Sequence, residues 1–235
     1  MNCIINISVN LVEKYTIDGH KALVFDDVMS PEQVDKWRNQ KQDLKFYPTK
    51  FNQNNTRQYI AGTNFAVTPV FAEQRETLFS TQEWIMPYLN EFDERIKYSD
   101  FQRSFINRYT KGCHCEAHKD INEFKGSDDF YAVGLMFVSI EDDTDVEHNG
   151  FILHSDDYTQ EVIVPHKFNR MMLFDARIIH APQIPNCGFE RLTYYFGFSN
   201  FSPMLRPQQE QRKFYLHHMI PNTTYLVDIN NPISH

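Results

Sequence analysis

Residues 101–109 read FQRSFINRY, a strand-length run that opens the part of the chain deciding the fold. Similar short apolar runs follow it, separated by Gly, Pro, Asn and Asp. They comprise residues 131–140, 151–154, 161–164, 170–174 and 192–198. Many short strands separated by turn-forming residues predict an antiparallel sandwich or jelly roll.

Helical patterns precede this series, so we expect a mostly β fold with flanking helices, of the α+β class. Ser30 as the N-cap, Pro31 at the first helical position and Gln33 three residues after the cap predict a helix start. Apolar residues at roughly helical spacing predict one or two packing helices within residues 74–97. Pro87 should bend or break them.

The other segments have weaker patterns. Residues 3–9 and 22–25 are rich in Ile, Val and Leu and are predicted to be short strands. Residues 47–68 are polar and Asn/Gln-rich, which predicts a loop with short extended pieces; a role in facing a ligand is left open. Residues 203–235 form a polar tail, in which residues 208–213 are predicted to be helical.

The chain has 235 residues, a length that fits one domain better than two. We therefore expect a single domain over residues 1–235. Its expected parts are a supporting region of helices and strands over about 1–100, a jelly-roll core over about 101–200 and a C-terminal extension over about 201–235.

Charge and composition exclude some classes of function. A net charge of −8 argues against non-specific electrostatic binding of nucleic acid. The four cysteines lack the paired spacing of a structural zinc site, and they fit reduced thiols in a cytoplasmic protein. Neither a signal-peptide pattern nor an apolar run of spanning length is present, so we expect no membrane partner.

The strongest chemical signal is His118-Lys119-Asp120. Alternate residues on a strand point the same way, so this imidazole and this carboxylate could share a metal ion. A single His-x-Asp is common and needs a third ligand. His180 supplies one, at the end of an apolar strand where a polar loop is expected to begin. Two imidazoles and one carboxylate form the ligand set of non-haem iron(II) oxygenases, which leaves open positions on the metal.

Arg191 is a candidate for binding a carboxylate. It stands at the start of a predicted strand and could point inward, where an arginine needs a partner. A guanidinium pairs with a carboxylate through two hydrogen bonds, so a dicarboxylate cosubstrate would explain its position. An ordinary salt bridge within the protein is the alternative.

In their order and spacing, His118-x-Asp120, His180 and Arg191 resemble the iron(II)/2-oxoglutarate oxygenase superfamily, most closely its prolyl-4-hydroxylase-like branch. Shorter motifs add to the likeness. They are NRYTKG at 107–112, NGFIL at 149–153, LFD at 173–175 and the strand-to-helix opening ALVFDD at 22–27 followed by SPE at 30–32.

The resemblance implies a double-stranded β-helix, the cupin-like form of the jelly roll. It implies that His118, Asp120 and His180 hold Fe(II) and form the catalytic centre. It further implies 2-oxoglutarate as cosubstrate, with its far carboxylate on Arg191, dioxygen as oxidant and stimulation by ascorbate. Tyr109 and Thr193 are then expected as further contacts of 2-oxoglutarate.

The implied activity is hydroxylation of an unactivated C–H bond, in a prolyl or other amino-acid side chain of a peptide or protein, or in a free amino acid. Asp120 favours hydroxylation, or another two-electron oxidation such as desaturation, over halogenation, because the superfamily's halogenases carry Gly or Ala at this position. The arginine-rich strand of nucleobase demethylases is absent, which argues against repair of alkylated bases.

The sequence departs from the branch at two positions. Arg191 stands where many relatives carry lysine, and Asn149 replaces the first glycine of the usual Gly-Gly pair. Two other functions stay open: a non-catalytic jelly-roll module for binding or assembly, and an oxygenase of another small metabolite. The sequence leaves the substrate and the oligomeric state open.

Overall fold

The structure is a computed structural model, and it describes only part of the chain. The described residues are 9–44, 47–48, 66–69, 77–78, 85–97, 101–110, 117–121, 129–139, 149–183 and 190–199. The predicted strand at 3–8, most of the polar segment at 47–68 and the tail at 203–235 lie outside them. Among the described residues, no helix has the length and apolar character needed to cross a membrane.

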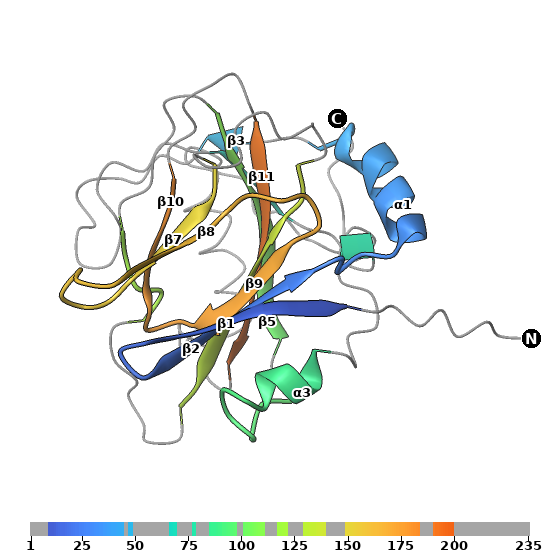
Figure 1. The fold of residues 1–235 in the computed structure, drawn as a ribbon. Coiled ribbons are helices and arrows are strands. Elements are labelled where there is room, and N and C mark those ends of the chain that lie inside the picture. The colour runs from blue at the N-terminus through green and yellow to red at the C-terminus, as the bar shows by residue number, and fades with distance from the viewer. Residues whose placement is uncertain are drawn as a thin grey trace, which may run out of the picture.

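Two antiparallel sheets make up the fold (Figure 1). The eight-stranded sheet has the order β1 (Asn10–Ile17), β2 (His20–Asp26), β9 (Met171–Asp175), β6 (Tyr131–Phe137), β11 (Arg191–Ser199), β5 (Phe101–Tyr109), β4 (Ala66–Pro69) and β3 (Tyr47–Pro48). The three-stranded sheet has the order β10 (Ile179–Pro182), β7 (Phe151–His154) and β8 (Glu161–Val164). This arrangement confirms the predicted mostly β, jelly-roll class.

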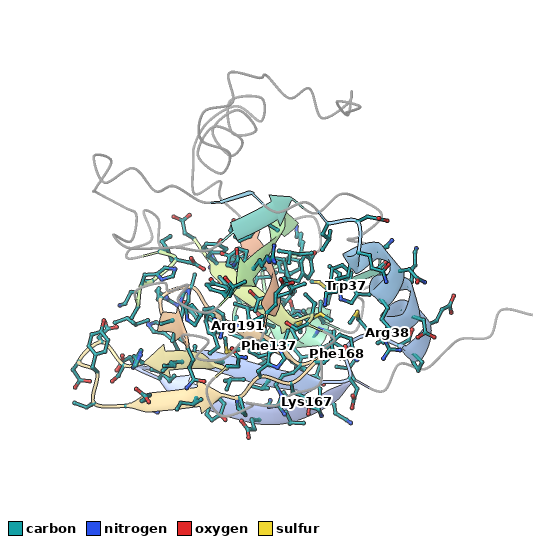
Figure 2. The ribbon with its side chains drawn as sticks, turned by 90° about the horizontal axis from the view of Figure 1, so that it is seen from above. Trp37, Arg38, Phe137, Lys167, Phe168 and Arg191 are labelled. Atoms are coloured by element: carbon teal, nitrogen blue, oxygen red, sulfur yellow. The ribbon has the colours of Figure 1, made fainter. Side chains whose placement is uncertain are left out.

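In the described part of the chain, helices α1 (Pro31–Lys41) and α3 (Met86–Leu89) pack beside the larger sheet. The capping box of α1 is present: Ser30 Oγ accepts from Gln33 N at 3.3 Å, and Gln33 Oε1 accepts from Ser30 N at 2.8 Å. Trp37 points from α1 into the interior, where its Nε1 donates to Val138 O at 2.8 Å (Figure 2). Pro87 lies in the first turn of α3, which begins at Met86; residues 77–78 are also helical, and residues 79–84 between them lie outside the described residues.

The larger sheet is covered on both faces, which explains why its central strands are apolar at nearly every position. On β11, Leu192, Tyr194 and Phe196 belong to a core shared with α1 and α3. Tyr195 belongs to a second core, shared with Phe151 of the smaller sheet. Because residues alternate along a strand, Arg191 and Thr193 lie on the same face as Tyr195, between the two sheets.

Two strands were missed by the sequence interpretation. β1 carries mostly exposed residues because it is an edge strand, so it lacks the apolar signal of the central strands. β10 occupies residues where a polar loop was expected after His180, and all four of its residues are buried. It pairs with β7, with His180 opposite Leu153. His180 is therefore held inside a strand, and the expected loop is wrong at this point.

We predict that Gly134→Ala destabilises the fold. Gly134 lies opposite Phe196 in the β6–β11 ladder, and a Cβ atom at this position would lie 2.0 Å from Phe196 Cζ. Because Phe196 is fully buried, the free energy of unfolding should fall by about 1 to 3 kcal/mol in urea titrations. Adding Phe196→Leu should give a double variant that loses less than the sum of the single losses. Strictly additive losses would contradict this packing.

Candidate metal centre

A pair of backbone hydrogen bonds joins the two segments that carry the predicted metal ligands. His118 N donates to His180 O at 3.0 Å, and His180 N donates to His118 O at 2.8 Å. Asp120 N donates to Ala176 O at 3.1 Å, in the turn that precedes β10. The His-x-Asp residues were expected to share one face of a strand. Instead, His118 makes an isolated bridge, and β10 and its preceding turn orient the segment.

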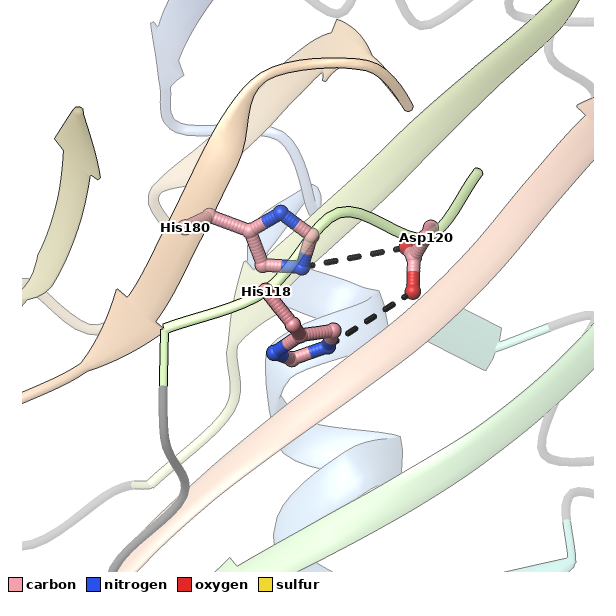
Figure 3. Close-up of side chains that lie close together, drawn as sticks. All are labelled: His118, Asp120 and His180. Carbon is pink, nitrogen blue, oxygen red and sulfur yellow. Dashed lines mark ion pairs between the residues drawn. The ribbon is translucent and has the colours of Figure 1, made fainter. Parts of the chain in front are cut away.

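The side chains of His118, Asp120 and His180 converge (Figure 3). His118 Nε2 lies 3.7 Å from Asp120 Oδ1, and His180 Nε2 lies 3.8 Å from Asp120 Oδ2. The ligand atoms of all three residues lie within 4.8 Å of one another. These separations are too long for hydrogen bonds. They fit donors around one ion, because metal bonds to nitrogen and oxygen are about 2 Å long.

His180 is prepared to act as a neutral ligand. Its Nδ1 lies 2.9 Å from Ile178 O, and a carbonyl only accepts, so Nδ1 carries the proton. Burial, reinforced by the nearby His118, lowers the pKa of His180 to about 4, although Asp120 acts in the opposite direction. At neutral pH its Nε2 therefore presents a lone pair toward Asp120. Such a bond to the second ring nitrogen is the usual way to fix the tautomer of a metal-binding histidine.

Asp120 is held by a residue that the sequence interpretation missed. Tyr195 Oη donates to Asp120 Oδ2 at 2.9 Å, and Tyr131 Oη lies 2.7 Å from Tyr195 Oη. A signal for Tyr195 was available in the sequence. It stands two residues after Thr193 and four after Arg191 on one strand, so all three share a face.

Arg191 is fully buried at the start of β11, as predicted, and lies in the interior in Figure 2. Its Nη1 donates to Asn149 O at 3.0 Å and to Gly150 O at 3.1 Å, and its Cζ lies 4.6 Å from the centre of the Tyr109 ring. Gly150, which the sequence shares with the usual Gly-Gly pair, has to be glycine, because its Cβ would lie 2.3 Å from Val164 O.

Between Arg191 and the triad lies a cross-strand pair, Thr193 on β11 and Asn107 on β5. Both side chains are buried, and within the described part of the chain Thr193 Oγ1 and Asn107 Oδ1 have no hydrogen-bond partner. Buried polar atoms nearly always have partners, so this pair is a candidate position for a bound water molecule or a polar ligand. Thr193 was predicted as a site residue, whereas Asn107 was noted only as part of a motif.

No protein-family profile matches the sequence, and no curated protein matches it. Solved structures do match. A viral collagen prolyl hydroxylase from Paramecium bursaria Chlorella virus-1, in complex with 2-oxoglutarate, has a TM-score of 0.53 and 16% identity, covering 77% of this chain and 96% of its own. A Trichoplax adhaerens prolyl hydroxylase, in complex with a peptide of hypoxia-inducible factor, has a TM-score of 0.55 and 14% identity, covering 75% and 82%.

A third match is a non-haem α-ketoglutarate-dependent carbocyclase from nogalamycin biosynthesis, with a TM-score of 0.56 and 11% identity, covering 87% of this chain and 90% of its own. The chain has the fold of the iron(II)/2-oxoglutarate oxygenases. Within this oxygenase fold, the double-stranded β-helix implied by the sequence resemblance is confirmed. The His-x-Asp and distal His of the resemblance are the residues that converge in Figure 3.

We predict that the metal-free protein becomes less stable as the pH falls from 6.5 toward 4. The pKa of His180 is about 4 in the folded chain against an ordinary value of 6.5, so protons bind the unfolded chain first and favour unfolding. Between pH 7 and pH 5, the titration of His180 should lower the free energy of unfolding by about 2 kcal/mol, measured by urea titration. His180→Gln, which removes the titrating group, should show a smaller loss over the same interval. Equal losses in both proteins would contradict the burial of a neutral imidazole.

Proposed function

We propose that this protein is an iron(II)- and 2-oxoglutarate-dependent oxygenase that hydroxylates an unactivated C–H bond. The observation that carries the proposal is the convergence of His118, Asp120 and His180 within 4.8 Å on this fold. Two imidazole nitrogens and one carboxylate oxygen suit Fe(II) and leave three positions on the metal for other ligands. Bound iron and 2-oxoglutarate would supply the oxidising chemistry, in which dioxygen is consumed and succinate and carbon dioxide are released.

In this proposal, side chains of the protein bind 2-oxoglutarate and orient it. Arg191 offers a fixed guanidinium to the far carboxylate of 2-oxoglutarate, because its Nη1 is already held by two backbone carbonyls. Thr193 lies midway between Arg191 and Tyr195 on the same face, where its hydroxyl can bond the cosubstrate. Tyr109, whose ring lies against the guanidinium, and Asn107 border the same space.

Aromatic side chains enclose the centre on its buried side. The ring of Phe174 meets His180 edge-on at 4.8 Å, and the ring of Phe151 stacks on it at 5.6 Å. These rings exclude water from behind the distal ligand. Exclusion of water strengthens the electrostatic interactions of the site and protects reactive species from side reactions.

For the substrate, we propose an amino-acid side chain, prolyl or other, in a peptide or protein, or a free amino acid. The match to a prolyl hydroxylase in complex with a peptide supports this class. A small metabolite is the second candidate, favoured by the match to a carbocyclase. We also propose a cytoplasmic location, from the reduced state expected of the four cysteines.

We predict that His118→Ala and Asp120→Ala abolish the weak visible charge-transfer absorption that Fe(II) and 2-oxoglutarate give together in anaerobic wild-type protein. The reason is that each change removes one of the three metal ligands. Both variants should also lose succinate formation with a panel of proline-containing peptides and free amino acids. His154→Ala, on β7 beside Glu161, is the control and should behave as wild type. A non-catalytic jelly-roll module would give no such absorption in the wild-type protein.

We predict that Thr193→Val weakens the binding of 2-oxoglutarate roughly 2- to 10-fold, the value of one hydrogen bond. Valine keeps the shape of threonine but removes Oγ1, which is buried and has no partner within the described part of the chain. The measurement is titration of 2-oxoglutarate into anaerobic Fe(II)-loaded protein, followed by its visible absorption. Thr16→Val, at an exposed position of β1, is the control. An unchanged affinity would exclude Thr193 from the cosubstrate site.

A further inference from the structure

Two buried phenols form a chain that ends on the carboxylate of Asp120. Tyr195 Oη donates to Asp120 Oδ2 at 2.9 Å, and Tyr131 Oη lies 2.7 Å behind Tyr195 Oη. Tyr195 is 6% exposed and Tyr131 is 3% exposed. The chain therefore lies in the interior, where hydrogen bonds are stronger than in water.

The direction of the chain follows from its proton count. A phenol has one proton to donate, and an ionised carboxylate can only accept. Tyr195 gives its proton to Asp120, so Tyr131 must be the donor to the oxygen of Tyr195. A phenol that accepts a hydrogen bond becomes a better donor, so Tyr131 strengthens the bond between Tyr195 and Asp120.

The surrounding structure holds both phenols in place. The ring of Tyr195 stacks on Phe105, with centroids 4.5 Å apart and an interplanar angle of 12°. Gly197 makes room for Tyr131, because a Cβ atom at this glycine would lie 2.6 Å from Tyr131 Cε2.

Backbone hydrogen bonds also connect Tyr131 with Asp120, the two ends of the phenol chain. Ala176 N donates to Tyr131 O at 3.0 Å, and Asp120 N donates to Ala176 O at 3.1 Å. Tyr131 and Asp120 are therefore linked twice, once through Tyr195 and once through Ala176. This double link fixes the position of the carboxylate relative to the larger sheet.

We infer that Tyr195 is a positioning residue that holds the Asp120 carboxylate where one metal ion can contact it together with both imidazoles. The inference rests on the proposed function. Both carboxylate oxygens lie near the imidazoles, Oδ1 at 3.7 Å from His118 Nε2 and Oδ2 at 3.8 Å from His180 Nε2, and Tyr195 binds Oδ2 from β11. The phenol therefore fixes the rotation of the carboxylate, which sets the distance from each oxygen to the place where the metal would bind.

The test is Tyr195→Phe, which keeps the stacked ring and removes only the donor. Fe(II) affinity, measured by anaerobic calorimetry, should fall about 10-fold or more, the usual effect of losing a hydrogen bond to a metal ligand. In the Fe(II)-loaded variant, 2-oxoglutarate should bind more weakly, and its charge-transfer absorption should shift. Urea titration of the metal-free variant reports folding separately from these measurements of ligand binding.

Two further variants make the test specific. Tyr131→Phe removes the donor at the far end and leaves the Tyr195–Asp120 bond, so it should shift the same properties in the same direction but less. Tyr194→Phe, on the same strand but in the opposite core, should leave metal binding and absorption unchanged. If Tyr195→Phe destabilises the fold, the inference is tested by Tyr131→Phe, which should give a smaller change in the same direction.

Wild-type affinities and an unshifted absorption in Tyr195→Phe would overturn the positioning role, while the wild-type absorption would still support the proposed function. A wild-type protein that gives no absorption with Fe(II) and 2-oxoglutarate would overturn the proposed function, and the inference with it. The two failures are therefore distinguishable in one set of titrations.

Discussion

The site depends on two reciprocal backbone hydrogen bonds between His118 and His180, residues that lie far apart in the sequence. The bridge places one ligand-bearing segment directly against β10, and β10 is paired on its other side with β7. The turn before β10 then accepts Asp120 N through Ala176 O. One strand and its preceding turn therefore set the positions of all three side chains, and the smaller sheet anchors them to the core. Without this bridge, each of the three side chains and its backbone would lose conformational entropy separately on binding a metal.

Strand β11 carries three further residues of the candidate site. Residues on one face of a strand recur about every 6.7 Å, twice the rise per residue. Arg191, Thr193 and Tyr195 therefore lie at regular intervals along the strand. The series begins at the buried guanidinium of Arg191 and ends at Tyr195, which donates a hydrogen bond to Asp120. The intervening residues Leu192 and Tyr194 belong to the core with α1 and α3. A single strand thus packs into the core with one face and spaces the candidate site residues with the other, because side chains alternate along it.

Features encoded by neighbouring residues could be predicted from the sequence. The capping box of α1, the strands at 101–109, 151–154 and 161–164 and the inward position of Arg191 are of this kind. Features that depend on a distant partner could not. β10 is a strand because β7 and His118 satisfy its backbone groups, and β1 carries an edge strand's weak pattern. The face that Tyr195 shares with Arg191 and Thr193 could be predicted from the period of a strand, but its hydrogen bond to Asp120, which is distant in sequence, could not.

The two imidazoles of the triad are not equivalent. The side chain of His180 is 4% exposed and that of His118 is 25% exposed, with Asp120 between them at 12%. His180 is fixed on three sides, by Ile178 O and by the rings of Phe151 and Phe174, and burial keeps it neutral. His118 is therefore the more accessible of the two imidazoles, while packed aromatic rings close the side on which His180 lies.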